Sequence, residues 1–239
     1  MKIGIVNDIH NNLIALEAVL NKIENECDMI ICSGDIIGIG PYPEETEQKV
    51  MQIENLIAVK GNHEKYLIEG LPNDFPNEER MDIDEMYHHK WEHSKLSDSS
   101  ITFLNKLPYI KTLETDGKKI AVMHYALDMK NNYVKCGCTP TPNYLDKIFY
   151  NVNADIIIYG HEHNKNICCS NKTYINVGSL GCPGRDKNIA RYGILELTNN
   201  NINIYAKEIK YNSKAVVDKI NELNYPASNE IKTFFYGIN

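Results

Sequence analysis

The chain repeatedly places a short, apolar, β-branched run directly before a polar motif. Six runs follow this pattern: Lys2–Val6, Met29–Cys32, Leu56–Val59, Ile120–Met123, Asp155–Tyr159 and Tyr174–Val177. Runs of this length and composition are typical of buried strands. Between the first two, apolar residues recur at helical spacing after Asn12, a suitable N-cap, which predicts a helix over 13–26. Strand, helix and strand form a βαβ unit, so the sequence predicts an α/β fold.

Each run stops at or just before side chains that commonly bind metal ions, or before glycines. The motifs are Asn7-Asp8-Ile9-His10, Ser33-Gly34-Asp35, Gly61-Asn62-His63-Glu64, His124, Gly160-His161-Glu162-His163 and Gly178-Ser179. Open α/β sheets bind ligands outside the carboxyl ends of their strands. We therefore expect these motifs to meet at one edge of the fold.

These side chains suit divalent metal ions. The motifs at 8–10 and 161–163 each place two ligands on either side of one residue, so a sharp turn can direct both at one ion. Asp35 can bridge two ions, and Asn62 offers a neutral carbonyl oxygen. Imidazole with carboxylate favours borderline divalent metals. Two ions about 3.5–4 Å apart would clamp a phosphoryl group and generate hydroxide at neutral pH.

Each motif alone has an ordinary structural interpretation, as a helix cap, a turn or a solvated loop. Their order along the chain, however, resembles that of the calcineurin-like metallophosphoesterases, above all the small bacterial and archaeal phosphodiesterase branch. The stretches GDIIGIGPYP (34–43) and NVGSLGCP (176–183) and a Trp-bearing segment at 85–107 resemble that branch. The likeness runs from residue 3 to about 210. It implies two mixed β-sheets sandwiched with flanking helices, an αββα arrangement.

The resemblance also implies roles for individual residues. It assigns Asp8, His10 and His163 to a first ion, Asp35 to a bridge, and Asn62, His124 and His161 to a second ion. His63 matches a non-ligand histidine that protonates the leaving group, a role suited to a side chain that titrates near neutrality. Asn62 and Arg185 are candidate substrate contacts. The implied cofactors are two divalent ions, Mn first, with Fe, Ni, Co or Zn as alternatives.

We expect residues 1–239 to form a single domain with a helical insertion at about 66–106 and C-terminal helices at about 213–236. The insertion contains His88, His89 and His93. His89 and His93 have the i,i+4 spacing of metal ligands. No third ligand is evident, so we interpret these histidines as a solvated helix face.

Composition limits the partners. With 25 basic and 32 acidic residues the net charge is −7, and no basic stripe is visible, which disfavours long nucleic acid as a partner. No apolar run has the roughly 18 residues of a membrane span. The start of the chain lacks the regions of a secretory signal, so we expect no membrane association and a cytoplasmic location.

Seven cysteines, including the pairs Cys136/Cys138 and Cys168/Cys169, show no disulfide or zinc spacing and are interpreted as small buried residues and loop thiols.

The expected activity is hydrolysis of a small phosphate ester, preferably a diester, by attack of metal-bound hydroxide with His63 as general acid. A phosphomonoesterase of the protein phosphatase or dinucleotide polyphosphate hydrolase type is the alternative within enzymes. The scarcity of arginine, three in the chain, favours the diester. From a different class, a non-catalytic scaffold of this fold is less favoured because His63 and the ligand set are intact. The oligomeric state is not predicted.

Overall fold

The structure is a computed structural model that describes residues 1–72, 81–135, 140–198 and 201–238. Cys136 and Cys138 lie outside the described residues, as does Arg80. No helix in the described ranges is both long and apolar enough to cross a bilayer.

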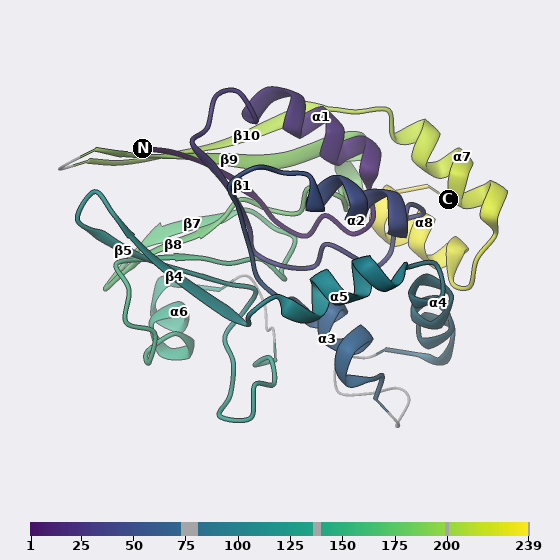
Figure 1. The fold of residues 1–239 in the computed structure, drawn as a ribbon, viewed down its shortest axis with the longest axis horizontal. Helices are drawn as coiled ribbons and strands as arrows, with labels where there is room; N and C mark the ends of the chain where they lie inside the picture. The colour runs from purple at the N-terminus through teal and green to yellow at the C-terminus, as the bar shows by residue number, and fades with distance from the viewer. Residues whose placement is uncertain (73–80, 136–139, 199–200, 239) are drawn as a thin grey trace.

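Two five-stranded mixed sheets stack face to face (Figure 1). Their strands are β1 (Lys2–Val6), β2 (Met29–Cys32), β3 (Leu56–Ala58), β4 (Ile110–Thr115), β5 (Lys118–Met123), β6 (Ile156–Ile158), β7 (Asn166–Cys169), β8 (Thr173–Asn176), β9 (Ile189–Thr198) and β10 (Asn201–Lys210). The first sheet has the order β10-β9-β1-β2-β3, with β1, β2 and β3 parallel. The second has the order β4-β5-β6-β8-β7, with β5, β6 and β8 parallel.

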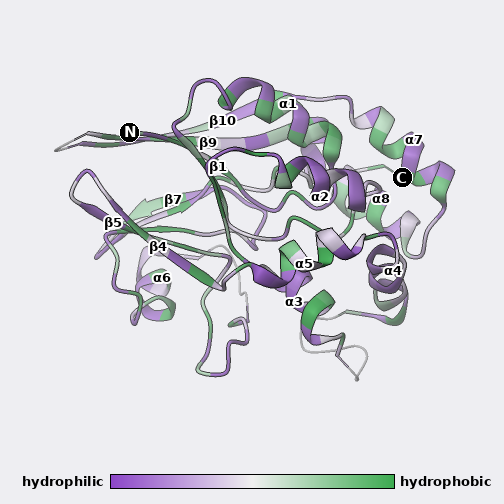
Figure 2. Ribbon diagram, in the orientation of Figure 1, coloured by the Kyte–Doolittle hydropathy of each residue, from purple (hydrophilic) through white to green (hydrophobic). Residues whose placement is uncertain are grey.

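Helices flank the two sheets. They are α1 (Leu13–Ile23), α2 (Pro43–Met51), α3 (Asn62–Glu69), α4 (Ile83–His93), α5 (Asp98–Lys106), α6 (Pro142–Ile148), α7 (Ser213–Leu223) and α8 (Ser228–Tyr236), with a short 3-10 turn, η1 (Gly184–Asp186). In Figure 1, α1 lies along the first sheet and α6 beside the second, while α4, α7 and α8 gather at one end. Figure 2 shows hydrophobic and hydrophilic segments alternating around α1 and α7, as expected for helices with one packed face.

The core has an inner layer between the sheets and an outer layer under the helices. Ile156 and Ile158 of β6 belong to the inner layer, which also contains Ile3 and Ile5 of β1. Ile157, between them, packs in the outer layer beneath α6. Successive side chains of a strand point to opposite faces. A strand buried on both faces therefore reads as a continuous apolar run, which explains the three consecutive isoleucines.

The predicted αββα fold class is confirmed. β1 and β2 have the bounds that the sequence predicts, and the predicted helix after Asn12 is α1, whose first turn donates from Ala15 N to Asn12 Oδ1 (3.1 Å). Helices α2 and α6 and strands β4 and β7 have no counterpart among the predicted elements. β4 is mostly exposed and polar, so it lacks the apolar run that marks the central strands. The division of the chain into one domain with an insertion stays a prediction.

The expectation of a solvated face for His88, His89 and His93 is wrong. His88 is 2% exposed, His89 is fully buried and His93 is half-buried. Helix α4 packs against the C-terminal region, where the rings of Trp91 and Tyr225 stack with centroids 4.3 Å apart. Periodicity along α4 shows which residues share a face, but not that another part of the chain covers the polar face.

Candidate metal centre

The loops after β1, β2, β5 and β6 meet at one edge of the sandwich. His10 N donates to Asp35 O (3.0 Å), which joins the two loops of the first sheet. Gly160 N donates to His124 O (2.9 Å), which joins the two loops of the second sheet. The sheets themselves are linked where His161 N donates to Asp8 Oδ1 (2.8 Å). The strand ends therefore bring together side chains that are up to 153 residues apart.

The backbone at the candidate ligands is unusual. Left-handed φ angles occur at Asp8 (52°), His10 (49°), Asp35 (53°), His161 (73°) and His163 (55°). This region costs an ordinary residue about 1–2 kcal/mol, and such strain is concentrated at functional sites. The sharp turns expected at 8–10 and 161–163 are these left-handed residues, and they direct the neighbouring side chains to a common point.

Two glycines permit the close packing of this edge. A Cβ at Gly38 would collide with the ring of His63, and one at Gly61 would collide with the carboxylate of Asp35. The glycines of the motifs at 34–38 and 61–64 are therefore required by the close approach of backbone to the site.

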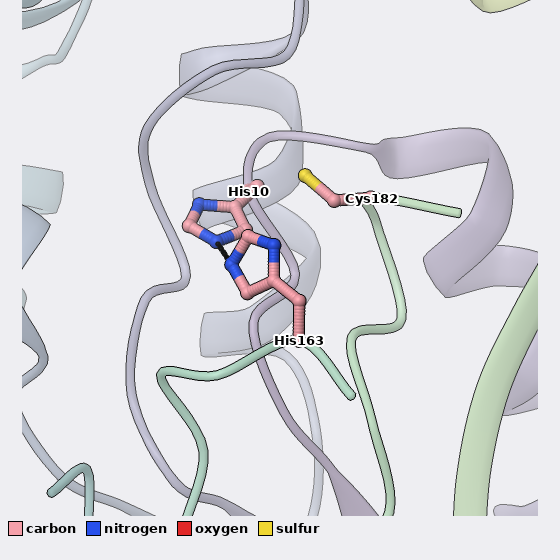
Figure 3. A group of neighbouring side chains, drawn as sticks. All are labelled: His10, His163 and Cys182. Atoms are coloured by element: carbon pink, nitrogen blue, oxygen red, sulfur yellow. Dashed lines mark hydrogen bonds between the residues drawn. The ribbon is translucent and has the colours of Figure 1, made fainter. Parts of the chain in front are cut away.

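A first group of donors is formed by His10, His163 and Cys182. Figure 3 shows the two imidazoles turned toward each other, with Cys182 beside them. The two Nε2 atoms are 2.8 Å apart. The His10 Nδ1–H can donate to Ile37 O (3.1 Å), which leaves Nε2 as the lone-pair nitrogen, the arrangement typical of a metal-ligating histidine. Burial raises the pKa of the Cys182 thiol well above its usual range.

A second group is formed by Asp35, His124, His161 and Asn62. His124 Nε2 lies 3.2 Å from Asp35 Oδ2, and Asn62 Oδ1 lies 3.0 Å from both His124 Nε2 and His161 Nδ1. His124 Nδ1 lies 2.9 Å from Ser33 O, so the ring is oriented from behind in the same way as His10. Burial opposes a charge on His124, but Asp35 outweighs it and raises the pKa of that imidazole to about 9.

Asp35 lies between the two groups. Its Oδ2 is 3.2 Å from His124 Nε2, 3.8 Å from His10 Nε2 and 3.9 Å from His63 Nε2. Burial by itself raises the pKa of a carboxyl, but the imidazoles around Asp35, His124 first, hold its pKa well below the usual range. Asp35 is therefore a carboxylate within 4 Å of three histidines from three different segments of the chain.

Asp8 is fully buried and has an unused oxygen. Its Oδ1 accepts from His161 N, whereas Oδ2 has no hydrogen-bond partner among the described residues. Burial raises the pKa of Asp8, and His163 and His124 oppose that rise. An unpartnered buried carboxylate oxygen is costly. A cation at this point would satisfy it, so this donor set fits a divalent ion.

His63 lies at the rim of the same cluster. Its side chain is 10% exposed, more than the 3% or less of His10, His124 and Asp35. Its Nδ1 has no partner among the residues that the structure describes. Burial lowers the pKa of His63 to about 4, with Asp35 opposing and His89 adding to the shift. The ring is thus placed to contact a ligand of the cluster without being enclosed by it.

Two residues at this edge were not among the predicted site residues. One is Cys182, which no local pattern connects with His10 because a long loop brings it there. The other is Glu64, a buried carboxylate that accepts four backbone N–H groups, from Asp35 (2.9 Å), Ile36 (2.8 Å), Ile37 (3.1 Å) and Gly61 (2.6 Å). Glu64 fixes the loop that carries Asp35. Its position three residues after the helix N-cap, as in a capping box, is a signal that can be found in sequence.

Arg185 stands apart from the cluster. It is exposed on η1, and no contact joins it to the candidate ligands within the described ranges. The structure brings together the other predicted site residues: Asp8, His10, Asp35, Asn62, His63, His124, His161 and His163. Their roles as ligands and as proton donor remain predictions.

Comparison with known proteins agrees with this geometry. Residues 1–200 match the family model described as the calcineurin-like phosphoesterase superfamily domain. The uncharacterized protein MJ0912 of Methanocaldococcus jannaschii is 30% identical over 91% of each chain. A metallophosphoesterase from Sphaerobacter thermophilus has a similar structure, with a TM-score of 0.76 and 23% identity over 100% of this chain and 99% of that one.

A structure described as a novel archaeal phosphodiesterase is similar over 87% of this chain and 100% of its own, with a TM-score of 0.51 and 18% identity. At these identities the structural likenesses concern the fold. The family-model match covers most of the chain, and the order of ligand-type motifs agrees with it. The chain therefore belongs to the calcineurin-like phosphoesterase superfamily.

Proposed function

We propose that this chain is a dinuclear metal-dependent phosphodiesterase that hydrolyses a small phosphate diester. The observation that carries the proposal is the position of Asp35, whose Oδ2 lies between His124 Nε2 at 3.2 Å and His10 Nε2 at 3.8 Å. One ionised carboxylate between two sets of imidazoles is the arrangement of a bridging ligand.

We divide the seven predicted ligands between two ions, with Asp8 in place of Cys182 beside His10 and His163. Asp8, His10 and His163 would hold one, Asn62, His124 and His161 would hold the other, and Asp35 would contact both. When bound, two divalent ions supply a nucleophilic water at neutral pH and offset the charge of the phosphate. Imidazoles make up four of the seven ligands, so Mn, Fe, Co, Ni or Zn fits better than Ca, and Mn is our first choice.

His63 is proposed to donate the proton that the leaving oxygen needs. Its ring lies beside Asp35 and at the rim of the cluster, with Nδ1 free of partners in the described structure. Gly38 packs against this ring, which limits its rotation. An anionic phosphate bound beside the imidazole favours its protonated form.

The basic residues favour a diester. A phosphomonoester carries a second negative charge, and arginine forks suit the phosphate geometry best. Of the arginines in the described structure, Arg185 is exposed and Arg191 is paired with Asp186 and Glu208, and no hydrogen bond or ion pair joins either one to a candidate ligand there. The name of the archaeal phosphodiesterase is consistent with this preference. The net charge of −7 supports a small substrate over long nucleic acid.

Turnover tests the proposal directly. Chelated protein is reloaded with Mn²⁺ and assayed with bis(p-nitrophenyl) phosphate, p-nitrophenyl phosphate and a panel of cyclic nucleotides and dinucleotides. We expect kcat/KM for a diester to exceed that for the matched monoester by at least about tenfold, a difference of about 1.4 kcal/mol in activation free energy. A monoester preference would support a phosphomonoesterase instead. No turnover by protein with two bound ions would support a scaffold.

A further inference from the structure

Helix α4 carries a second cluster of ligand-type side chains, which we call the α4 cluster: His89, Glu92 and His93. Their ligand atoms all lie within 4.8 Å of one another. His89 and Glu92 are fully buried, and His93 is half-buried. None of the three is among the seven candidate ligands of the dinuclear centre. The missing third ligand for His89 and His93 is therefore present in the structure, as Glu92.

The α4 cluster contains buried polar atoms that nothing in the described structure satisfies. Both ring nitrogens of His89, Oε2 of Glu92 and Nε2 of His93 lack a hydrogen-bond partner among the described residues. Leaving a buried polar group unsatisfied is costly, and almost all such groups in native proteins have a partner. A bound cation would accept lone pairs from one ring nitrogen of His89, from Glu92 and from His93, whose ligand atoms lie within 4.8 Å of one another.

The distances suit a metal ion better than a hydrogen bond. His89 Nδ1 and Glu92 Oε2 are 3.5 Å apart, too far for a good hydrogen bond. Two ligands bound at 2.0–2.2 Å to one tetrahedral zinc ion lie about 3.4 Å from each other. On a helix, residues three and four apart share a face, so positions 89, 92 and 93 present their side chains together.

Glu92 is held in the orientation of a ligand. Its Oε1 accepts from Asn11 Nδ2 (2.6 Å) and from the backbone N–H of Gly38, which leaves Oε2 directed at His89. Burial by itself raises the pKa of a carboxyl, but His89 and His88 outweigh it and hold the pKa of Glu92 well below its usual range. Donors that fix the second oxygen of a ligating carboxylate are the usual surroundings of a metal ligand.

We propose that His89, Glu92 and His93 bind a third divalent ion of the zinc type, separate from the proposed dinuclear centre. Two imidazoles and one carboxylate form a donor set that zinc favours, with a fourth position for water. The ring of His63 lies between the two sites, with its centroid 5.0 Å from that of His89 and 4.9 Å from that of His10. Through Glu92, the ion ties α4 to the loops that carry Asn11 and Gly38.

The test is a count of metal ions in the full-length chain, independent of activity. Metal-free protein is titrated with Zn²⁺ against a chromophoric chelator, and bound zinc is measured by mass spectrometry after gel filtration. We expect three ions per chain in the wild type, two in His93→Gln and Glu92→Gln, and about one in Asp35→Asn, which loses the dinuclear centre. His88→Gln is the matched control, because His88 is buried on the same helix but accepts from Ile39 N (3.0 Å) instead; it should keep three ions.

Several results would overturn the proposal. Two ions in the wild type leave no third site, and three in both His93→Gln and Glu92→Gln place the third ion elsewhere. Loss of all ions from a variant with native circular dichroism means that the α4 cluster is part of the dinuclear centre. Should both variants fail to fold, the wild-type titration decides. A wild type with three ions and Asp35→Asn with none also contradicts a separate site, whatever the outcome for the proposed phosphodiesterase activity.

Discussion

The strand-end cluster, which is proposed to bind two ions, and the α4 cluster lie on either side of His63 and are built in opposite ways. The first draws its ligands from loops of both sheets, and many of these residues have left-handed backbone. The second comes from three residues within one stretch of a single helix, 89–93, with ordinary helical backbone. The first cluster therefore requires the whole fold to bring its ligands together. The second has its spacing from local structure and obtains only its burial from the fold.

This difference separates two ways of placing a charged group in a protein interior. At the strand ends the chain accepts backbone strain, because only a sharp turn directs neighbouring side chains to the same point. On α4 the backbone is unstrained, and the cost is that buried nitrogens and oxygens lack hydrogen-bond partners among the described residues. The following substitutions test each of these costs.

Asp35→Asn is expected to have the largest effect. It removes the charge between the two donor groups, so both ions of the dinuclear centre should be lost and diester hydrolysis should fall to background. His163→Ala, the control, removes a ligand of one group only and should lose mainly one ion. Metal analysis of both purified variants measures this. Equal metal content in Asp35→Asn and wild type contradicts a bridging role.

His63→Asn should keep both ions of the dinuclear centre and lose activity selectively. Hydrolysis of an alkyl or nucleotide diester should fall by roughly 10²–10⁴-fold, the usual contribution of general acid catalysis. The loss with bis(p-nitrophenyl) phosphate should be clearly smaller, since p-nitrophenolate leaves without a proton. The measurement is kcat for both substrates with metal content verified. An equal loss on both substrates points to a role in positioning, and loss of ions shows that His63 is a ligand.

Glu47→Gln tests a buried carboxyl whose pKa is raised by burial and by other carboxylates, unlike the pKa of Asp35, which neighbouring imidazoles lower against the effect of burial. Both oxygens of Glu47 lack partners among the described residues, and burial raises its pKa to about 9, with Glu64 adding to the rise. The native state thus holds a proton that the unfolded chain releases above about pH 4.5, so this contribution to stability is present in acid and is lost as pH rises toward 9.

Removing the titrating group should stabilise the protein on the order of 3 kcal/mol at pH 7 and change little at pH 5. Urea unfolding of wild type and Glu47→Gln at the two pH values gives the difference. A difference that does not vary with pH means that Glu47 is not protonated in the native state.

Asn11→Ala and Asn11→Gly test the connection between the clusters. Asn11 has a φ of 52° and donates from Nδ2 to Glu92 Oε1 (2.6 Å). Loss of a hydrogen bond to a buried carboxylate costs roughly 1.5–3 kcal/mol. Asn11→Gly loses the same bond but adopts left-handed backbone freely, so it should be more stable than Asn11→Ala by about 1 kcal/mol. Equal unfolding midpoints would show that the backbone is not strained there.

Central strands, helix starts and candidate ligands can be predicted from the sequence, whereas edge strands and long-range contacts cannot. Isoleucine-rich runs such as Ile156–Ile158 identify central strands because both of their faces are buried, and Asn12 marks the start of α1 through its side-chain cap. Polar edge strands and short helices carry weaker local patterns. Candidate ligands are recognisable because motifs recur at strand ends. The burial of His89 and the arrival of Cys182 beside His10 depend on long-range packing, which no local pattern encodes.

The division of the candidate ligands between the two sheets has a consequence for cooperativity. Asp8 and Asp35 follow strands of the first sheet, whereas His124 and His161 follow strands of the second. Ions bound by both sets would hold the sheets together, because the sheets could not separate without breaking coordination bonds to the ions. Metal loading would then decide whether the two sheets unfold together in one transition or separately in two.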